Sequence, residues 1–204
     1  MGQVFRRAEQ YLDQFDPDYI GQFVEIGTSR NGDDGSTKTI AAWAARFDKH
    51  LWTVDMDPAN CEFVDNMNLP NVNVINSTGE DYLKEFPGHI TYISFLYLDN
   101  FDWDWHPEKT EDFVIAQQQR YADLGFRMNN VNSQRAHLQQ AVLALPALAE
   151  QCLVVCDDTW YNKWWGHYSG KCGAVVPFLL NNGFDVLYTE EHPEYGTILG
   201  RGIK

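Results

Sequence analysis

The sequence predicts an α/β protein, a three-layer sandwich with a mostly parallel sheet of seven strands. Short apolar runs with the length of buried strands alternate with longer stretches whose apolar residues recur at helical spacing. The first apolar run leads into a Gly-rich turn and then a helix, the strand–loop–helix order of α/β folds. The last two runs are close enough in sequence to form a hairpin-like pair.

The predicted elements follow in order along the chain. Strands are expected at residues 23–26, 51–55, 72–75, 90–99, 153–158, 184–190 and 195–200. Helices are expected at residues 4–15, 39–47, 58–67, 81–86, 111–124, 132–150 and 171–180. Pro146 falls inside the sixth helical stretch, where a missing backbone N–H can kink or break the helix. The last two strands are expected to meet at a His192–Pro193 turn.

The Gly-rich turn after the first strand holds Gly27, Gly32 and Gly35, and Ser36 or Thr37 can cap the helix behind it. A helix N-terminus beneath such a loop can hold an anion or a polar ligand. The dinucleotide fingerprint G-x-G-x-x-G is missing, because Gly27 is followed by Thr and Ser. A dinucleotide-dependent oxidoreductase is therefore disfavoured.

Composition sets limits on the class of protein. With 204 residues, 44% of them hydrophobic, the chain is expected to be one domain, residues 1–204. A net charge of −14 repels phosphate backbones and anionic lipid, so neither nucleic acid nor membrane is expected as a partner. There is no run of about 18 apolar residues and no signal-peptide core at the N-terminus, so a cytoplasmic protein is expected. The four cysteines lack zinc-ribbon spacing and are expected to be free thiols.

A long connection, residues 101–131, separates the fourth strand from the sixth helix. It contains Trp103, Trp105 and His106, followed by an amphipathic stretch. Insertions of this length in compact domains tend to be functional, so this segment is expected to be a substrate lid.

Three carboxylates follow two buried strands. Asp99 closes the fourth strand, and Asp157 and Asp158 close the fifth, so all three are expected at one edge of the sheet. Hard divalent cations such as Mg²⁺ take oxygen ligands of this kind, although a pair of Asp can also simply begin a turn. The nearest cations in the sequence after Asp158 are Lys163 and Lys171, so an added cation or a proton is expected to relieve the repulsion.

Val24–Gly27, followed by Val54–Pro58, resembles the opening of the class I S-adenosylmethionine-dependent methyltransferases. That family has a Rossmann-like sheet with an antiparallel last strand, and its Gly-rich loop passes the methionine end of the cofactor. The resemblance implies that Asp55 binds the ribose and that Glu80 accepts the adenine amino group. Its implied cofactor-binding residues are Glu25, Gly27, Thr28, Ser29, Asp55, Met56, Ser77, Thr78, Glu80 and Asp99. Helix capping by Ser77 or Thr78, with Glu80 in the first turn, explains the latter residues equally well.

Asp99, Asp157 and Asp158 resemble the metal site of the cation-dependent O-methyltransferases, of catechol type or macrocin type, and the paired Asp fits the macrocin type better. The resemblance implies methyl transfer to a hydroxyl of a small molecule, a sugar or an aromatic diol, with Mg²⁺ bound. Where the catechol type has a Lys base this chain has Asp102, so Asp158 and His137 are the candidate catalytic residues. The alternatives are a metal-independent methyltransferase, a dinucleotide-dependent oxidoreductase and an inactive cofactor-binding protein.

The aromatic residues after Asp158 are a further candidate site. Trp160, Tyr161, Trp164 and Trp165 can stack on a sugar or an aromatic ring, or form a contact between copies of the chain. A homo-oligomer is therefore possible.

Overall fold

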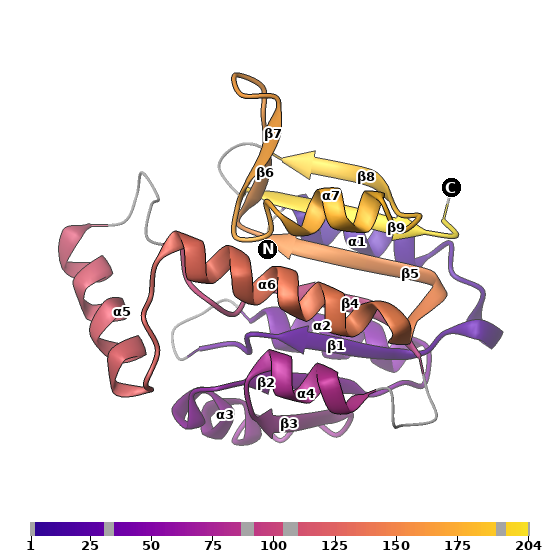
Figure 1. The fold of residues 1–204 in the computed structure, drawn as a ribbon. Coiled ribbons are helices and arrows are strands. Elements are labelled where there is room, and N and C mark those ends of the chain that lie inside the picture. The colour runs from indigo at the N-terminus through magenta and orange to yellow at the C-terminus, as the bar shows by residue number, and fades with distance from the viewer. Residues whose placement is uncertain (1–2, 31–34, 87–91, 104–109, 191–194, 204) are drawn as a thin grey trace.

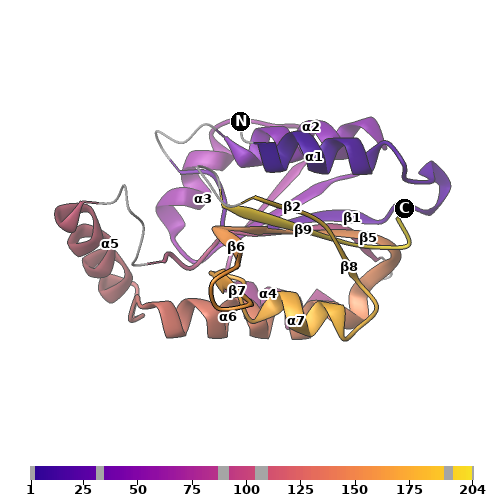
Figure 2. The same cartoon turned by 90° about the horizontal axis from the view of Figure 1, so that it is seen from above.

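The computed structural model describes residues 3–30, 35–86, 92–103, 110–190 and 195–203. A central sheet is covered by helices on both faces, as Figures 1 and 2 show. One face carries α1 (Gln3–Leu12), α2 (Ser36–Arg46) and α3 (Pro58–Asp65), and the other carries α4 (Gly79–Glu85), α6 (Asn130–Ala144) and α7 (Val175–Leu180). Helix α5 (Glu111–Asp123) lies beyond one end of these layers (Figure 2).

The sheet has seven strands in the order β3-β2-β1-β4-β5-β9-β8. They are β1 (Gln22–Ile26), β2 (Leu51–Asp55), β3 (Val72–Asn76), β4 (Ile93–Leu98), β5 (Leu148–Asp157), β8 (Asp185–Glu190) and β9 (Gly196–Arg201). All neighbours pair in parallel except β9, which is antiparallel to both β5 and β8. The predicted fold class is confirmed.

The alternating side chains of the strands divide the core between the two faces. Val24 and Ile26 of β1 pack in the cluster under α4, α6 and α7, whereas Phe23 packs in the cluster under α1 and α2. Glu25 therefore points to the α2 face, although it is charged and fully buried. Its position requires local partners, which the α2 face supplies.

Two predicted helices differ from the structure. The helix expected over 132–150 ends at Ala144, because Pro146 occupies a 3₁₀ turn, Leu145–Ala147, and the chain enters β5 at Leu148. The helix expected from Lys171 begins only at Val175. The preceding residues form an unpredicted hairpin of β6 (Thr159–Asn162) and β7 (His167–Gly170). The expected His192–Pro193 turn lies outside the described residues.

The four cysteines are free and buried, as expected. Within the described part of the chain, no helix is both long and apolar enough to span a membrane.

Candidate functional site

The candidate site lies at the carboxyl ends of the strands, where β1 and β4 are neighbours. From β1 the chain continues to β2 and β3 on one side, whereas β4 leads to β5 on the other. Connections that diverge in this way leave a crevice outside the strand ends, which is the usual ligand site of open α/β sheets.

Gly27 ends β1 and allows the loops after β1 and β4 to touch. Its φ is +96°, and a Cβ there would lie 2.6 Å from the backbone N and Cα of Asn100. Any other residue would push the two loops apart and strain the backbone. The structure thus gives Gly27 a role in the backbone of the crevice, whatever ligand the crevice holds.

Glu25 holds the loop and helix that follow β1. Its carboxylate accepts hydrogen bonds from the hydroxyls of Ser36 (2.6 Å), Thr37 (2.7 Å) and Thr53 (2.6 Å). Burial raises its pKa to about 7, and these three hydrogen bonds oppose the rise. Glu25 lines neither of the pockets described below, so it supports the site from beneath.

The loop after β1 is tied to the start of α2. The Ser29 amide donates to Thr37 Oγ1 (2.9 Å), and the Thr37 amide donates to Ser29 Oγ (3.1 Å). The N-cap of α2 is Gly35, which makes no side-chain cap, so the expected capping by Ser36 or Thr37 is wrong. Their hydroxyls are bonded to Glu25 instead. Residues 31–34 of the Gly-rich turn lie outside the described residues.

Asp55 closes β2 and lines one of two adjoining pockets that the described residues form at this edge of the sheet. Its Oδ1 accepts from the Asp57 amide (2.8 Å), and its Oδ2 accepts from Asn60 Nδ2 (3.0 Å) and the Thr28 amide (3.3 Å). Burial raises its pKa, while these hydrogen bonds lower it. A carboxylate has about four acceptor positions, so three protein donors leave room for one ligand hydroxyl.

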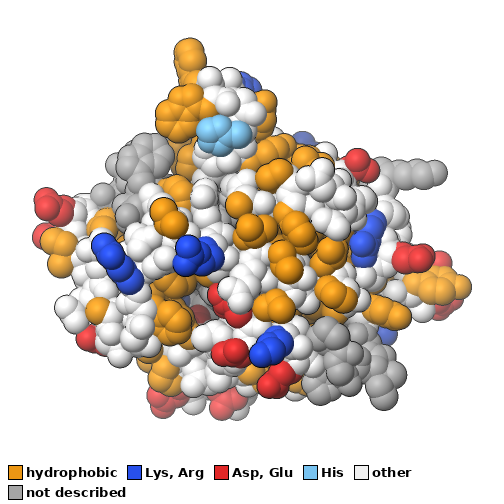
Figure 3. Space-filling view, in the orientation of Figure 1, with side chains coloured by type: hydrophobic (Ala, Val, Ile, Leu, Met, Phe, Trp, Pro, Cys, Tyr) orange, Lys and Arg blue, Asp and Glu red, His pale blue; other side chains and the backbone are white. Residues whose placement is uncertain are grey.

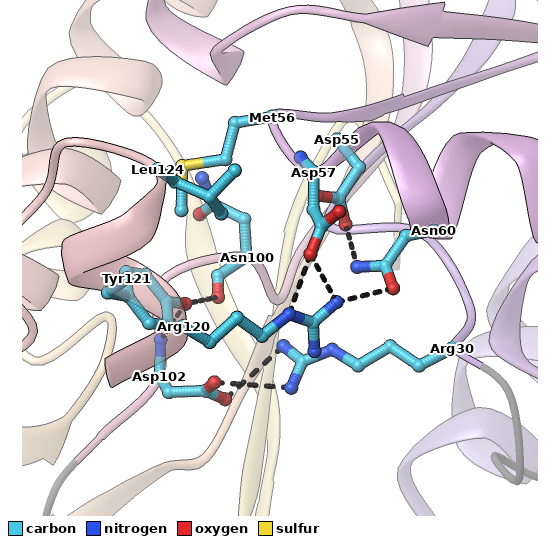
Figure 4. A pocket seen from close by; sticks show the side chains of 10 residues that line it. All are labelled: Arg30, Asp55, Met56, Asp57, Asn60, Asn100, Asp102, Arg120, Tyr121 and Leu124. Atoms are coloured by element: carbon cyan, nitrogen blue, oxygen red, sulfur yellow. Dashed lines mark hydrogen bonds and ion pairs between the residues drawn. The ribbon is translucent and has the colours of Figure 1, made fainter. Parts of the chain in front are cut away.

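The first pocket is narrow, with a volume of about 20 Å³, and is drawn in Figure 4. Its lining residues are Arg30, Asp55, Met56, Asp57, Asn60, Asn100, Asp102, Arg120, Tyr121 and Leu124. Arg120 reaches across from α5, donating Nε to Asp57 (2.6 Å) and Nη2 to Asn60 (2.7 Å). Arg30 forms an ion pair with Asp102 beside it, at 3.1 Å. Two arginines thus connect the strand ends with the segment expected to be a lid.

The second pocket, of about 290 Å³, adjoins the first through Met56 and Asn100, which line both. Thr78 and Glu80 also line it, and Glu80 accepts from Gln140 Nε2 at 3.0 Å. Asn100 Oδ1 is buried and has no hydrogen-bond partner among the described residues. Such an atom is costly to leave unpaired, which suits a ligand with a donor at this point.

For the loop after β3, the predicted helix capping is confirmed. Thr78 is the N-cap of α4 and accepts from the Asp81 amide. Ser77 donates its amide to the Asp55 carbonyl at 3.0 Å and lines neither pocket. Thr78 and Glu80 therefore combine a capping role with a place in the second pocket, whereas Ser77 has only the structural contact.

The three carboxylates after β4 and β5 gather as the sequence indicates, but around a lysine. Lys171 Nζ lies 2.5 Å from Asp99, 3.0 Å from Asp158 and 3.5 Å from Asp157. The Lys171 side chain is only 3% exposed. Burial lowers the pKa of this ammonium, but the charges of Asp158, Asp99 and Asp157 together raise it well above its ordinary value.

The expectation that no basic residue balances this cluster is therefore wrong. The hairpin β6–β7 returns the chain to the end of β5, where the Lys171 amide donates to the Asp158 carbonyl at 3.1 Å. Among the described residues, no group of three or more His, Cys, Asp or Glu side chains is arranged to hold a metal ion. The Lys171 ammonium lies where the oxygens would have to converge on Mg²⁺, so the donor set does not fit that ion.

His137 is fully buried on α6. Its Nδ1 is 2.7 Å from the Ser133 carbonyl, and burial lowers its pKa to about 4. The imidazole is therefore neutral near pH 7, with the proton on Nδ1 and the lone pair on Nε2. Nε2 has no partner among the described residues, and His137 lines neither pocket.

The aromatic residues after Asp158 divide into two groups. Trp160 packs on Tyr195 and Tyr161 on Tyr168, with ring centroids 4.7 and 5.1 Å apart. Trp164 and Trp165 are 94% and 73% exposed near the turn of the hairpin, which projects at the top of Figure 3 with hydrophobic side chains at its tip. They do not line either pocket.

The expected lid contains α5, which contacts the site through a small cluster. Phe101, Tyr121 and Met128 pack together, and Tyr121 Oη accepts from the Asp102 amide at 2.8 Å. Trp105 and His106 lie outside the described residues.

Sequence reasoning missed several residues of the site. Arg30, Asn60, Asn100, Arg120 and Tyr121 line the first pocket, and Lys171 joins the carboxylates. Asn100 carried a signal, as a polar residue directly after a buried strand, and Lys171 was one of the two nearest cations after Asp158. The others look like ordinary surface or helix residues until the fold brings them together.

No protein-family model matches this chain, and no curated protein matches it. Solved structures do resemble it. SMU.1697c from Streptococcus mutans, solved in complex with SAH, is 12% identical with a TM-score of 0.52 over 98% of this chain and 99% of that one. An rRNA methylase from Streptococcus thermophilus is 10% identical, with a TM-score of 0.53 over 98% of both chains. The O-methyltransferase NovP is 12% identical, with a TM-score of 0.57 over 97% of this chain and 78% of that one. At these identities the likeness shows the fold.

Proposed function

We propose that this protein is an S-adenosylmethionine-dependent methyltransferase that acts on a hydroxyl group of a small molecule. The observation that carries the proposal is the pair of adjoining pockets over the carboxyl ends of β1, β2 and β4, with Asp55 lining one pocket and the unpaired Asn100 oxygen common to both. The similar solved structures support it, since they include an O-methyltransferase and a protein in complex with SAH.

The residues around the pockets suit the parts of this cofactor. Asp55 has one acceptor position left for a ribose hydroxyl. Met56 and Asn100 lie between the pockets, and Thr78 and Glu80 offer polar groups to an adenine in the larger pocket. Gly27, Thr28 and Ser29 form the turn that would pass the methionine end, and Glu25 holds the start of α2 behind that turn through Ser36 and Thr37.

Asp158, which like His137 lines neither pocket, is the more accessible candidate for the general base. Its side chain is 24% exposed, whereas His137 is fully buried. A base must come within hydrogen-bond reach of the proton that it accepts. Bound S-adenosylmethionine supplies an electrophilic methyl group. Asp158 would take the hydroxyl proton as the substrate oxygen bonds to that methyl carbon, while the bond from the methyl carbon to sulfur breaks and SAH is left.

The metal-independent alternative fits the site better than Mg²⁺ does. Asp99, Asp157 and Asp158 were the expected ligands, but the ammonium of Lys171 already contacts all three. Asp99 then serves the site through its ion pair with Lys171. The substrate and the oligomeric state stay predictions.

Calorimetric titration followed by a turnover assay tests the proposal. We expect S-adenosylmethionine and SAH to bind and NAD not to bind. Labelled methyl should then transfer to a member of a panel of sugars and aromatic diols. Binding of NAD alone would favour an oxidoreductase. Cofactor binding without transfer to any acceptor would favour a protein that keeps the fold without catalysis.

A further inference from the structure

The most unusual charged group in the described structure is the Lys171 ammonium. It is almost completely buried, yet it contacts three carboxylates that are each about one quarter exposed. An ammonium removed from water needs close negative partners, and here three carboxyl groups lie within 3.5 Å of it. The cation is therefore an inner part of the cluster, with the carboxylates between it and solvent.

The backbone fixes Lys171 at this point. The Lys171 amide donates to the Asp158 carbonyl, and the next amide, of Cys172, donates to Thr159 Oγ1 at 2.9 Å. Gly170, with φ +91°, precedes it, and a Cβ at Gly170 would lie 1.8 Å from the Asp158 carbonyl oxygen. The hairpin thus closes tightly on the end of β5 and delivers Lys171 to the carboxylates.

The charges explain why one cation is needed. Three carboxylates at neighbouring strand ends repel one another strongly when none is neutralised. A divalent ion and an ammonium both relieve that repulsion, but they cannot occupy the same place between the oxygens. Whichever is present also sets where the carboxylate oxygens lie.

We propose that Lys171 is a positioning residue whose ammonium replaces a divalent metal ion among Asp99, Asp157 and Asp158, and that its removal turns this cluster into a metal site. The statement about metal binding stands on the geometry alone. Its consequence for methyl transfer rests on the proposed function.

The test is a titration of the protein with Mn²⁺. Binding is measured by calorimetry and by the electron paramagnetic resonance signal of free Mn²⁺. Wild-type protein should bind no Mn²⁺ at this cluster. Lys171→Gln should bind one Mn²⁺, at least about tenfold more tightly than any residual binding by the wild type, because affinity for hard cations grows with the net negative charge of the ligands. Lys171→Gln combined with Asp158→Asn should lose that binding. Lys163→Gln, a lysine of the same hairpin, is the matched control and should behave as the wild type.

If Lys171 forms only a structural ion pair, the Mn²⁺-binding results should differ from those expected above. If Lys171→Gln folds, as judged by circular dichroism, and gains no Mn²⁺ binding, the proposal is wrong. Lys171→Arg keeps a cation and should stay without Mn²⁺ binding. If the Gln variant does not fold, Lys171→Met removes the charge while keeping a long side chain and should gain the Mn²⁺ binding. Stoichiometric Mn²⁺ binding by the wild type that is lost in Asp158→Asn would overturn the proposal by itself.

Methyl transfer gives the second readout. Transfer by the wild type should survive exhaustive chelation, whereas transfer by Lys171→Gln should fall and be restored by Mg²⁺ or Mn²⁺. If no variant transfers methyl to any acceptor, the proposed function fails, and the Mn²⁺ titration still decides the role of Lys171. Loss of wild-type transfer on chelation would refute the role of Lys171.

Discussion

Asp55 is the residue on which the proposed cofactor site depends most directly. Its three protein hydrogen bonds fix the carboxylate at the edge of the first pocket. In Asp55→Ala a bound ribose hydroxyl would lose its charged partner, which costs about 1.5–3 kcal/mol. We expect affinity for SAH to fall about 10- to 150-fold by calorimetry.

Asp65→Ala is the matched control, since it removes one exposed carboxylate from α3 at the same net charge change. It should bind SAH as the wild type does. Unchanged affinity in a folded Asp55→Ala would refute the ribose assignment.

The raised pKa of Glu25 predicts that the stability of the folded protein depends on pH. Burial raises its folded pKa from 4.5 to about 7. Between these values the folded protein keeps a proton that the unfolded chain releases, so the free energy of unfolding falls as pH rises through this window. The contribution is fully present below pH 4.5 and lost above pH 7. It amounts to about 3 kcal/mol, because a pKa difference of one corresponds to about 1.4 kcal/mol.

Glu25→Gln isolates this contribution, because the amide keeps the shape but does not titrate. Urea unfolding at a series of pH values should show the advantage of the wild type over Glu25→Gln shrinking by about 3 kcal/mol from pH 4.5 to above pH 7. Glu62→Gln, at an exposed position of α3, controls for the loss of one carboxylate. A difference between the wild type and Glu25→Gln that does not change with pH would show that burial does not shift the pKa of Glu25.

A site residue could be predicted from the sequence when it directly follows a strand, but not when a distant part of the chain brings it to the site. Asp55, Asp99, Asp157 and Asp158 directly follow apolar runs, so their place at the sheet edge could be predicted from strand ends alone. Lys171 could not, because it reaches Asp158 only through a hairpin that the sequence did not predict. Neither could Arg120, since an arginine on an amphipathic helix usually faces solvent.

At the scale of elements, α5 is attached to the body of the molecule through few groups. Arg120 bonds Asp57 and Asn60 at the start of α3, and Tyr121 packs on Phe101. In Arg120→Ala we expect faster amide exchange across α5, by about fivefold or more, because losing charge-assisted hydrogen bonds costs about 1 kcal/mol or more. Hydrogen–deuterium exchange by mass spectrometry measures it.

Gln119→Ala controls for the loss of a neighbouring side chain, since Gln119 bonds only Asp123 of the same helix among the contacts described. Its α5 should exchange nearly as in the wild type. If α5 exchanges equally in both variants, Arg120 does not hold it, and the lid hypothesis loses its principal contact.

Element boundaries show where local pattern ends. The apolar spacing of α6 continues past Ala144, so the pattern predicted one helix to residue 150. In the structure Pro146 follows the end of the helix, and the chain then pairs with β4 from Leu148 as strand β5. The hairpin of β6 and β7 pairs Thr159–Asn162 with His167–Gly170. From the sequence, the aromatic residues of this hairpin were interpreted as a ligand surface, and the strands that they form were not predicted.

For the whole molecule, strand alternation predicted the class of fold, and the resemblance supplied the position of the antiparallel strand. Those features repeat along the chain, so they could be predicted without knowing which distant residues come together in the fold. The substrate is different, because this fold is shared by an rRNA methylase and an O-methyltransferase among the similar structures. Fold alone cannot choose between them, but surface charge can.

The net charge of −14 predicts that structured RNA is not a substrate. The chain has 15 Lys and Arg against 29 Asp and Glu, and Arg30, Arg46, Arg120 and Lys171 already pair with carboxylates. RNA affinity requires phosphates neutralised by free cations, and it is largest at low salt. We expect no binding of ribosomal RNA fragments by filter retention or fluorescence anisotropy even at low ionic strength, with a basic RNA-binding protein as the positive control. Binding that weakens steeply with added salt would reveal a basic surface and replace the small-molecule acceptor with an RNA acceptor, while leaving the cofactor site at Asp55 unaffected.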